Sequence, residues 1–242
     1  MARATHPLKS ATLTATPMPR GTPHPPKLFP THSLDVRTDP VGAPRMLHGR
    51  VWALDGKGVL YTQDGDAAQS WQTPGYSWFA VSPDGSEAWV VGRSAETRRS
   101  DDTIRTAKLT STPDWQTIPV THRSMWGVDG IAWLDADHIV VKSHVNLELI
   151  GRVDGVWKTL HKVKGPAEGP LRPFFGHNAV VMASKSRILV YGRRKQRLWK
   201  LNTVTIEPQR FHSTLPRIWF TPDGTLWVDN GRLWRADFTP PE

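Results

Sequence analysis

An apolar segment, a Pro-Asp-Gly turn and a second apolar segment follow one another at residues 76–92, and this pattern constrains the fold most. Gly accepts positive φ and Pro fixes its own φ, so the tripeptide favours a tight reversal between two strands. Less regular copies lie at residues 44–54, 131–141, 179–190 and 218–228. Because hardly any window shows a helical apolar period, the sequence predicts an all-β protein.

A tryptophan-centred segment recurs towards the end of each of the first three units. Trp71, Trp115 and Trp157 are spaced by 44 and 42 residues. We predict that each marks the last strand of its unit, and that residues 209–212 replace it in the fourth unit. A large flat side chain on an outer strand can cover the neighbouring sheet, so we expect these tryptophans to pack between units.

Units of about 40 residues with four strands each are typical of a β-propeller. We therefore expect an all-β fold, a single β-propeller of five four-stranded blades. The blades are expected at residues 44–74, 76–120, 124–163, 174–212 and 216–237. The fifth unit lacks a last strand, so we expect an N-terminal strand at residues 33–37 to close that blade and remove a free sheet edge. A sandwich would leave the tryptophan spacing unexplained, and the repeat is too long for one solenoid coil.

Residues 1–31 differ from the rest of the chain, because they are rich in Pro and Thr and contain no acidic residue. We expect them to form a basic tail, extended or disordered, and residues 32–242 to form the propeller domain. The net charge of +9 fits either an acidic partner or ordinary solubility. The chain has no cysteine, which excludes disulfides and Cys-ligated zinc. No segment has the apolar length of a membrane span or the pattern of a secretory signal, so we expect a cytoplasmic protein.

The segment at residues 61–71 contains a hydroxyl residue, an Asp-Gly pair and a Trp, namely Thr62, Asp64, Gly65 and Trp71. It resembles the Asp-box of bacterial sialidase-like propellers, and the Ser-Pro-Asp-Gly-Ser turn at residues 82–86 resembles turns of WD-repeat-like propellers. The Asp-box resemblance implies a turn between the third and fourth strands of a blade. In that family the box is a folding element, so the resemblance implies a scaffold and no catalytic residue. A carbohydrate-binding, lectin-like or sialidase-like propeller is the alternative function that it suggests.

The sequence contains no recognisable catalytic or metal-binding pattern. None of its Glu residues lies near the start of a predicted first strand, where a central catalyst would be, and Asp129 alone occupies such a place. Glycoside hydrolysis requires a pair of carboxylates. The His residues show no metal-binding spacing, and no phosphate-binding glycine loop occurs. We therefore predict a protein that is not an enzyme and needs no cofactor or metal, with glycosidase-type activity left open.

Aromatic, Arg and His residues gather in the segments that connect one predicted blade to the next. These residue types dominate protein–protein interfaces, and loops carry most functions of such folds. We therefore predict that the protein binds a protein partner through this loop face, as a subunit or an adaptor. The candidate residues are Tyr76, Trp78, His122, Arg123, Trp126, Arg172, Phe174, Phe175, His177 and Arg217. The alternative is that the aromatic side chains fill the ends of the blades.

A basic cluster, consisting of Arg193, Arg194, Lys195 and Arg197, lies between the predicted second and third strands of the fourth blade. That position would place the cluster on the same face as the connections between blades. Its charge fits a contact with nucleic acid or with an acidic partner. The alternative is a solvated hairpin tip.

Overall fold

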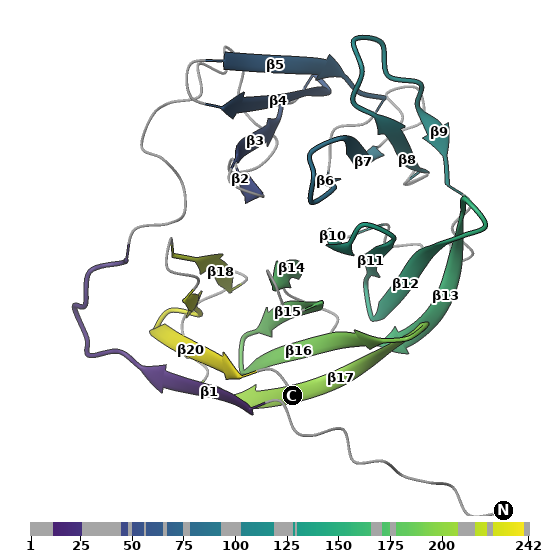
Figure 1. The fold of residues 1–242 in the computed structure, drawn as a ribbon. Coiled ribbons are helices and arrows are strands. Elements are labelled where there is room, and N and C mark those ends of the chain that lie inside the picture. Colours follow the sequence, from purple (N-terminus) through teal and green to yellow (C-terminus); the bar gives the residue numbers. More distant parts are fainter. Residues whose placement is uncertain are drawn as a thin grey trace, which may run out of the picture.

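The structure, a computed structural model, describes residues 12–25, 45–47, 50–55, 57–64, 67–74, 78–92, 103–118, 128, 130–165, 171–174, 178–207, 216–221 and 225–239. These residues form five four-stranded antiparallel sheets and no helix (Figure 1). The described part of the chain accordingly contains no helix long and apolar enough to span a membrane. The prediction of an all-β protein is confirmed.

Each sheet is built from strands that follow one another along the chain. The first sheet contains β2 (Arg45–Leu47), β3 (Arg50–Leu54), β4 (Val59–Asp64) and β5 (Ala67–Gln72). The second contains β6 (Trp78–Val81), β7 (Glu87–Gly92), β8 (Thr103–Lys108) and β9 (Gln116–Thr117). The third contains β10 (Gly130–Asp135), β11 (His138–Ser143), β12 (Asn146–Val153) and β13 (Val156–Lys164). The fourth contains β14 (Leu171–Phe174), β15 (Ala179–Ser184), β16 (Arg187–Arg194) and β17 (Arg197–Thr205).

The fifth sheet joins the two ends of the described chain. It has the order β1-β20-β19-β18 and contains β18 (Arg217–Phe220), β19 (Leu226–Asp229), β20 (Leu233–Thr239) and β1 (Thr12–Pro17). Strand β1 pairs antiparallel with β20, from Thr12 opposite Thr239 to Pro17 opposite Trp234. The prediction that an N-terminal strand completes the last sheet is therefore confirmed.

The predicted position of that closing strand was wrong. Residues 33–37 lie outside the described residues, and the closing strand β1 comes from the segment expected to be a tail. Thr alternates with Leu13 and Ala15 in β1, so the two apolar side chains share one face and pack on the core of the fifth sheet. The folded domain thus includes residues 12–17 and begins earlier than the expected residue 32.

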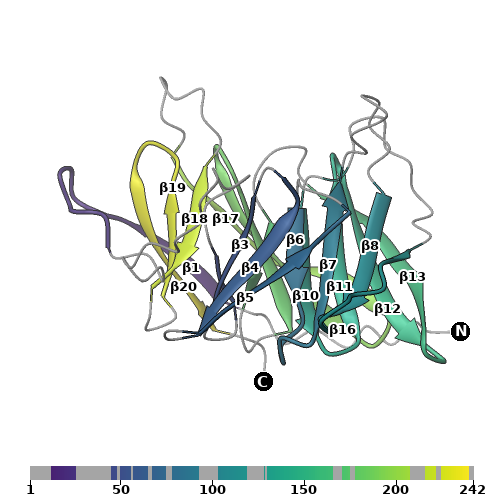
Figure 2. The same cartoon turned by 90° about the horizontal axis from the view of Figure 1, so that it is seen from above.

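The five sheets stand around a common centre, with β2, β6, β10, β14 and β18 innermost (Figure 1), and Figure 2 shows the same sheets turned by 90°. This architecture is consistent with a propeller-like arrangement. We call the end of the ring at which the innermost strands begin the start end, and the opposite end the far end. Turns between first and second strands and between third and fourth strands lie at the far end, because adjacent strands are antiparallel.

Hydrogen bonds between neighbouring sheets show that their start ends lie on the same side of the molecule. At the far end, Arg193, the next-to-last residue of the third strand of the fourth sheet, donates to Asp135, the last residue of β10. At the start end, Asn230 of the β19–β20 turn donates Nδ2 to the backbone oxygen of Lys185, in the β15–β16 turn, over 2.8 Å. The two ends defined above therefore hold from sheet to sheet.

The apolar core lies between neighbouring sheets. Trp89 of β7, Trp133 of β10 and Trp157 of β13 form an edge-to-face cluster between the second and third sheets, with ring centroids 4.8–6.2 Å apart. Trp89 is fully buried. Such pairs stabilise a fold beyond the area that they bury.

The first and second sheets are joined by two further tryptophans. Trp71 of β5 donates its indole Nε1 to the backbone oxygen of Thr110, and Trp115, just before β9, donates its own to the backbone oxygen of Gln72, both over 3.0 Å. Together with Trp157, these residues lie on or next to the outermost strands. The prediction that the recurring tryptophans pack between units is confirmed.

The Pro-Asp-Gly turn joins β6 to β7, the first and second strands of its sheet, as predicted. Asp84 accepts hydrogen bonds from the Ser82 hydroxyl (2.6 Å) and from the backbone N–H and hydroxyl of Ser86 (3.0 and 2.7 Å). These bonds, that of the Ser82 side chain above all, lower the pKa of Asp84 to about 2. Gly85 supplies the positive φ of 74° that the turn requires.

The fourth sheet differs from the prediction by one strand. Residues 179–190 were expected to hold its first and second strands, but they form β15 and part of β16, the second and third. Its first strand, β14, is short and contains Pro173, so its sequence looks like a loop. The last strand is β17, whereas residues 209–212, expected in that role, lie outside the described residues.

Candidate functional site

Three of the predicted partner-binding residues lie on innermost strands, close to the start end of the ring. Trp78 is the first residue of β6, Arg172 the second of β14 and Arg217 the first of β18. Trp78 and Arg172 are partly buried, and Arg217 is exposed. We call these three residues the inner cluster. The expectation that Arg172 and Phe174 lie in a loop was wrong, since both belong to β14.

Arg172 stands out electrostatically within the inner cluster. In the described part of the chain its guanidinium has one hydrogen-bond partner, the backbone oxygen of Leu171 (Nη1 to O, 3.0 Å), and no carboxylate. Burial lowers the pKa of Arg172 below its ordinary value. Removing a charge from water costs free energy unless an opposite charge or hydrogen bonds compensate, and such groups are candidates for binding sites.

Six of the other predicted partner-binding residues lie outside the described residues, and Phe174 is placed by its backbone alone. Those outside the described residues are Tyr76, His122, Arg123, Trp126, Phe175 and His177, and the side chain of Phe174 is outside them as well. The predicted interface is therefore seen through the inner cluster alone.

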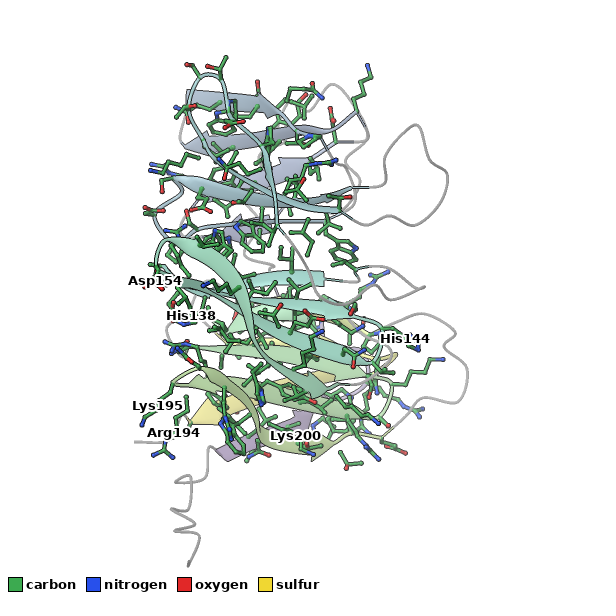
Figure 3. The ribbon with its side chains drawn as sticks, turned by 90° about the vertical axis from the view of Figure 1, so that its right-hand side faces the viewer. His138, His144, Asp154, Arg194, Lys195 and Lys200 are labelled. Atoms are coloured by element: carbon green, nitrogen blue, oxygen red, sulfur yellow. The ribbon has the colours of Figure 1, made fainter. Side chains whose placement is uncertain are left out.

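The basic cluster lies at the opposite end from its predicted position. It occupies the β16–β17 turn, between the third and fourth strands of its sheet, because the fourth sheet differs by one strand from the prediction. Figure 3 shows Arg194 and Lys195 at the same edge of the molecule as Asp154, away from His144 of the β11–β12 turn. The cluster therefore does not share a face with the inner cluster.

The members of the basic cluster also differ in their surroundings. Arg193 is partly buried and donates Nη2 to Asp135 Oδ2 over 2.8 Å. Arg194, Lys195 and Arg197 are exposed. Arg193 thus links two sheets, and the other three form a charged hairpin tip.

Arg152 in the third sheet has the same role as Arg193 in the fourth. Each is the next-to-last residue of a third strand and each reaches an acidic side chain of the preceding sheet. Arg152 donates Nη2 to Glu87 Oε2 over 2.6 Å and lies 4.5 Å above the ring of Trp157. These arginines therefore hold neighbouring sheets together at the far end.

Replacement of Asp135 by Asn is expected to lower the free energy of unfolding by about 1 kcal/mol at pH 7, a value reduced by solvent screening. Burial raises the pKa of Asp135, but hydrogen bonds from His138 and the Asp137 backbone, with the charges of His138 and Arg193, outweigh it and lower this pKa. A carboxylate whose pKa is lowered in the folded state stabilises the fold at pH values above the ordinary aspartate pKa of about 3.9. This stabilisation is lost as the pH falls through the folded-state pKa. Urea unfolding from pH 7 to 3 should therefore show the two proteins converging.

The matched control for Asp135→Asn is Arg197→Gln, which changes an exposed charge in the adjacent turn and should alter the free energy of unfolding by less than about 0.5 kcal/mol. A difference between Asp135→Asn and the unmodified protein that stays constant down to pH 3 would contradict the assigned ion pair.

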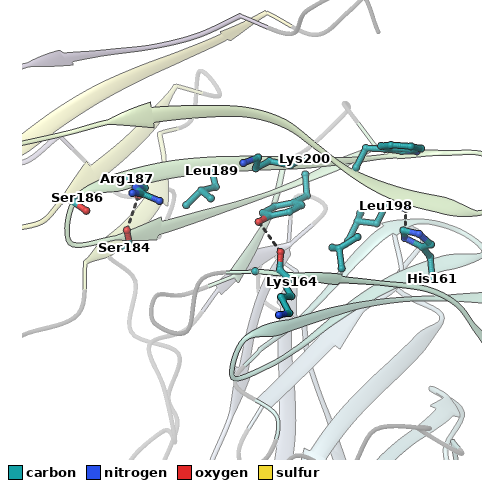
Figure 4. A pocket seen from close by; sticks show the side chains of 12 residues that line it. His161, Lys164, Ser184, Ser186, Arg187, Leu189, Leu198 and Lys200 are labelled. Carbon is teal, nitrogen blue, oxygen red and sulfur yellow. Dashed lines mark hydrogen bonds between the residues drawn. The ribbon is translucent and has the colours of Figure 1, made fainter. Parts of the chain in front are cut away.

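A groove of about 520 Å³, which the sequence did not predict, lies between β13 and the strands β16 and β17 (Figure 4). Three exposed cations line it: Lys164 at the end of β13, Arg187 at the start of β16 and Lys200 in β17. Trp199, which is 42% exposed, and the hydroxyls of Ser184 and Ser186 line it as well. The lining includes no acidic residue.

Two hydrogen bonds hold the walls of the groove together (Figure 4). The backbone N–H of Leu198 donates to His161 Nδ1 over 3.3 Å, which leaves the imidazole proton on Nε2 when the ring is neutral. The Tyr191 hydroxyl donates to the backbone oxygen of Lys164 over 3.4 Å, and burial raises the pKa of Tyr191. The groove is thus a joint between two sheets with a defined geometry.

In the described part of the chain, no group of three His, Asp or Glu side chains is arranged so that it could hold a metal ion. The inner cluster and the groove are basic and aromatic. They are suited to binding an anionic ligand or partner.

No known protein family and no curated protein matches the sequence. A solved structure described as "The crystal structure of a functionally unknown protein from Desulfotomaculum acetoxidans DSM 771" is similar, with a TM-score of 0.53 and 16% sequence identity. The match covers 74% of this chain and 58% of that one, so this chain corresponds to little more than half of the other. At this identity the similarity supports the fold alone.

Proposed function

We propose that the protein is a five-bladed β-propeller that serves as a non-enzymatic subunit or adaptor and binds a protein partner at the start end of its ring. Five sheets of four strands around one centre, with β1 completing the last, support the propeller. The Asp-box-like segment supports it too, since it spans β4 and β5, the third and fourth strands of the first sheet.

The observation that carries the proposed function is the desolvated Arg172. An enzyme that uses an arginine to bind substrate also needs groups that perform the chemistry, and the described innermost strands offer one carboxylate, Asp135, which is already engaged by His138 and Arg193. A partner can instead provide the missing negative charge. Truncation of one member of a buried, hydrogen-bonded charge pair at an interface costs about 2–5 kcal/mol, so Arg172 would be a strong anchor.

Replacement of Arg172 by Gln is expected to weaken the partner's affinity by at least about 30-fold, because the acidic group of the partner loses its charge partner. The free energy of unfolding should stay equal or rise by up to about 1 kcal/mol, because a desolvated charge is removed from the free protein. Affinity purification of the tagged protein from its native host, followed by mass spectrometry and titration of the recovered partner, measures the first effect; urea unfolding measures the second.

Arg172→Lys keeps the charge and should retain part of the affinity, whereas Arg197→Gln at the far end should leave the affinity unchanged. Recovery of the protein alone would overturn the proposal. So would a partner that binds the Arg172→Gln variant as tightly as the unmodified protein.

A further inference from the structure

The groove between β13, β16 and β17 carries positive charge, and none of the described residues that line it is acidic. Lys164, Arg187 and Lys200 form no ion pair within the described residues, in contrast to Lys162 of β13, which pairs with Glu148 over 3.1 Å. Because the lining residues include no carboxylate, the field in the groove has one sign. A ligand that enters it should be an anion.

Trp199 adds a second, independent requirement. Its side chain is 42% exposed. The chain has eleven other tryptophans, and those that the structure describes are partly or fully buried. It lies in β17 between buried Leu198 and exposed Lys200 and lines the groove. An exposed indole beside cations offers a flat apolar surface on which a planar group can stack.

We propose that this groove binds single-stranded nucleic acid, with a base stacked on Trp199 and phosphates bound by Lys164, Arg187 and Lys200. Stacking platforms combined with a basic groove are the means by which proteins bind single strands without reading sequence. A duplex keeps its bases stacked internally and cannot supply one to Trp199. An acidic peptide would satisfy the cations but would leave the indole without a planar partner.

This inference is independent of the proposed protein partner, because the two sites use different residues. The inner cluster lies on innermost strands, whereas the groove is formed mainly by the outer strands of the third and fourth sheets. Loss of binding at one site is therefore not expected to affect the other.

The test uses the full chain and a fluorescein-labelled thymidine oligonucleotide of about ten nucleotides, a length within the usual site sizes of single-strand binders. Fluorescence anisotropy should show binding, and Trp199→Ala should weaken it by about 5-fold to 150-fold, the effect of losing one stacked base. Trp199→Phe should restore part of the affinity. The slope of log K against log salt concentration is negative, and its magnitude should decrease by about 0.7 for each phosphate contact removed. The combined variant Lys164→Gln and Lys200→Gln should therefore show a slope that is shallower by about 1.4.

Lys57→Gln is the matched control, because Lys57 is an exposed lysine in the turn between β3 and β4, away from the groove. It should change affinity by less than about twofold and leave the salt slope intact. Tighter binding of a duplex of the same sequence would overturn the proposal. Equal affinity for inorganic phosphate or thymidine monophosphate would show that the ligand is a small anion. Binding of polyglutamate that is insensitive to Trp199→Ala would show that the ligand is an acidic peptide. Either result contradicts the proposal.

Discussion

Deletion of residues 1–20 is expected to leave most of the protein unfolded or aggregated at room temperature. The deletion removes β1, whose six residues pair with β20 and whose Leu13 is 5% exposed. Loss of a buried leucine side chain alone costs about 2–5 kcal/mol, a large share of the 5–15 kcal/mol that stabilise a typical domain. Strand β20 would also become a free sheet edge. Circular dichroism in urea and size-exclusion chromatography measure the two effects.

Deletion of residues 1–10 is the control, because it retains β1. Its free energy of unfolding should lie within about 0.5 kcal/mol of that of the unmodified protein. The single substitution Leu13→Ala should fall between the two deletions. If the longer deletion gives a monomer with an unchanged unfolding midpoint, β1 does not complete the fifth sheet.

Replacement of Trp89 by Ala is expected to lower the free energy of unfolding by about 3–5 kcal/mol. Trp89 is fully buried and packs edge-to-face on Trp133 and Trp157, so its loss leaves a cavity between the second and third sheets. The substitution also removes the hydrogen bond from the Trp89 indole to Glu87 Oε1 (3.3 Å). Urea unfolding monitored by circular dichroism gives the difference.

Trp199→Ala provides the comparison for Trp89→Ala, since it removes the same side chain from an exposed position. Because 42% of the Trp199 side chain is already exposed, we expect a smaller loss in the free energy of unfolding than for Trp89→Ala. Equal losses for the two variants would show that the tryptophan cluster does not join the second and third sheets as described. The same pair separates stability from nucleic-acid binding, because Trp199→Ala alone should weaken the latter.

Local signals were sufficient to predict the number of sheets. Short turns with positive φ, such as that at Gly85, repeat with apolar strands on either side, and both features depend on neighbouring residues. The recurring tryptophans could be assigned to sheet interfaces because a side chain repeated at the same place in three successive units is expected to have the same structural role in each. The missing last strand of the fifth unit then required a strand from elsewhere.

The identity of that strand could not be read from local sequence. Residues 12–17 contain three threonines and end in Pro17, and Leu13 is their one large apolar side chain. Their stability as a strand comes from pairing with β20, near the other end of the described chain. A pattern that depends on a distant partner has no signature within its own window.

The strand order of the fourth sheet was mispredicted for a related reason. Pro173 usually argues against a strand, but β14 is innermost and has one free edge, where a missing N–H is tolerated. A better signal was present in the third strands. Gly151-Arg152 and Gly192-Arg193 precede turns in which Asp154 and Lys195 both have positive φ, 53° and 54°.

The groove was missed because its lining is assembled from four strands and the turn between two of them. Lys164 ends one sheet, and Arg187 and Lys200 belong to two strands of the next. Each cation looks like ordinary surface charge in the sequence, and their proximity depends on how β13 packs against β17. Trp199 was the one indication of a binding site in the sequence, because it is a large aromatic residue next to Lys200 in a strand that alternates between apolar and polar residues irregularly.

The pairing of β1 with β20 also affects how the protein can be synthesised. On the ribosome β1 emerges before every other described strand, and β20 emerges after them all. The first of these strands must therefore wait, unpaired, while the first four sheets are translated. Pro17, which has no backbone N–H to donate, and the short length of β1 make it a poor template for aggregation during that interval. The fifth sheet can be completed only after β20 has been synthesised, and a chain released before β20 would expose an unpaired strand that proteases and chaperones can recognise.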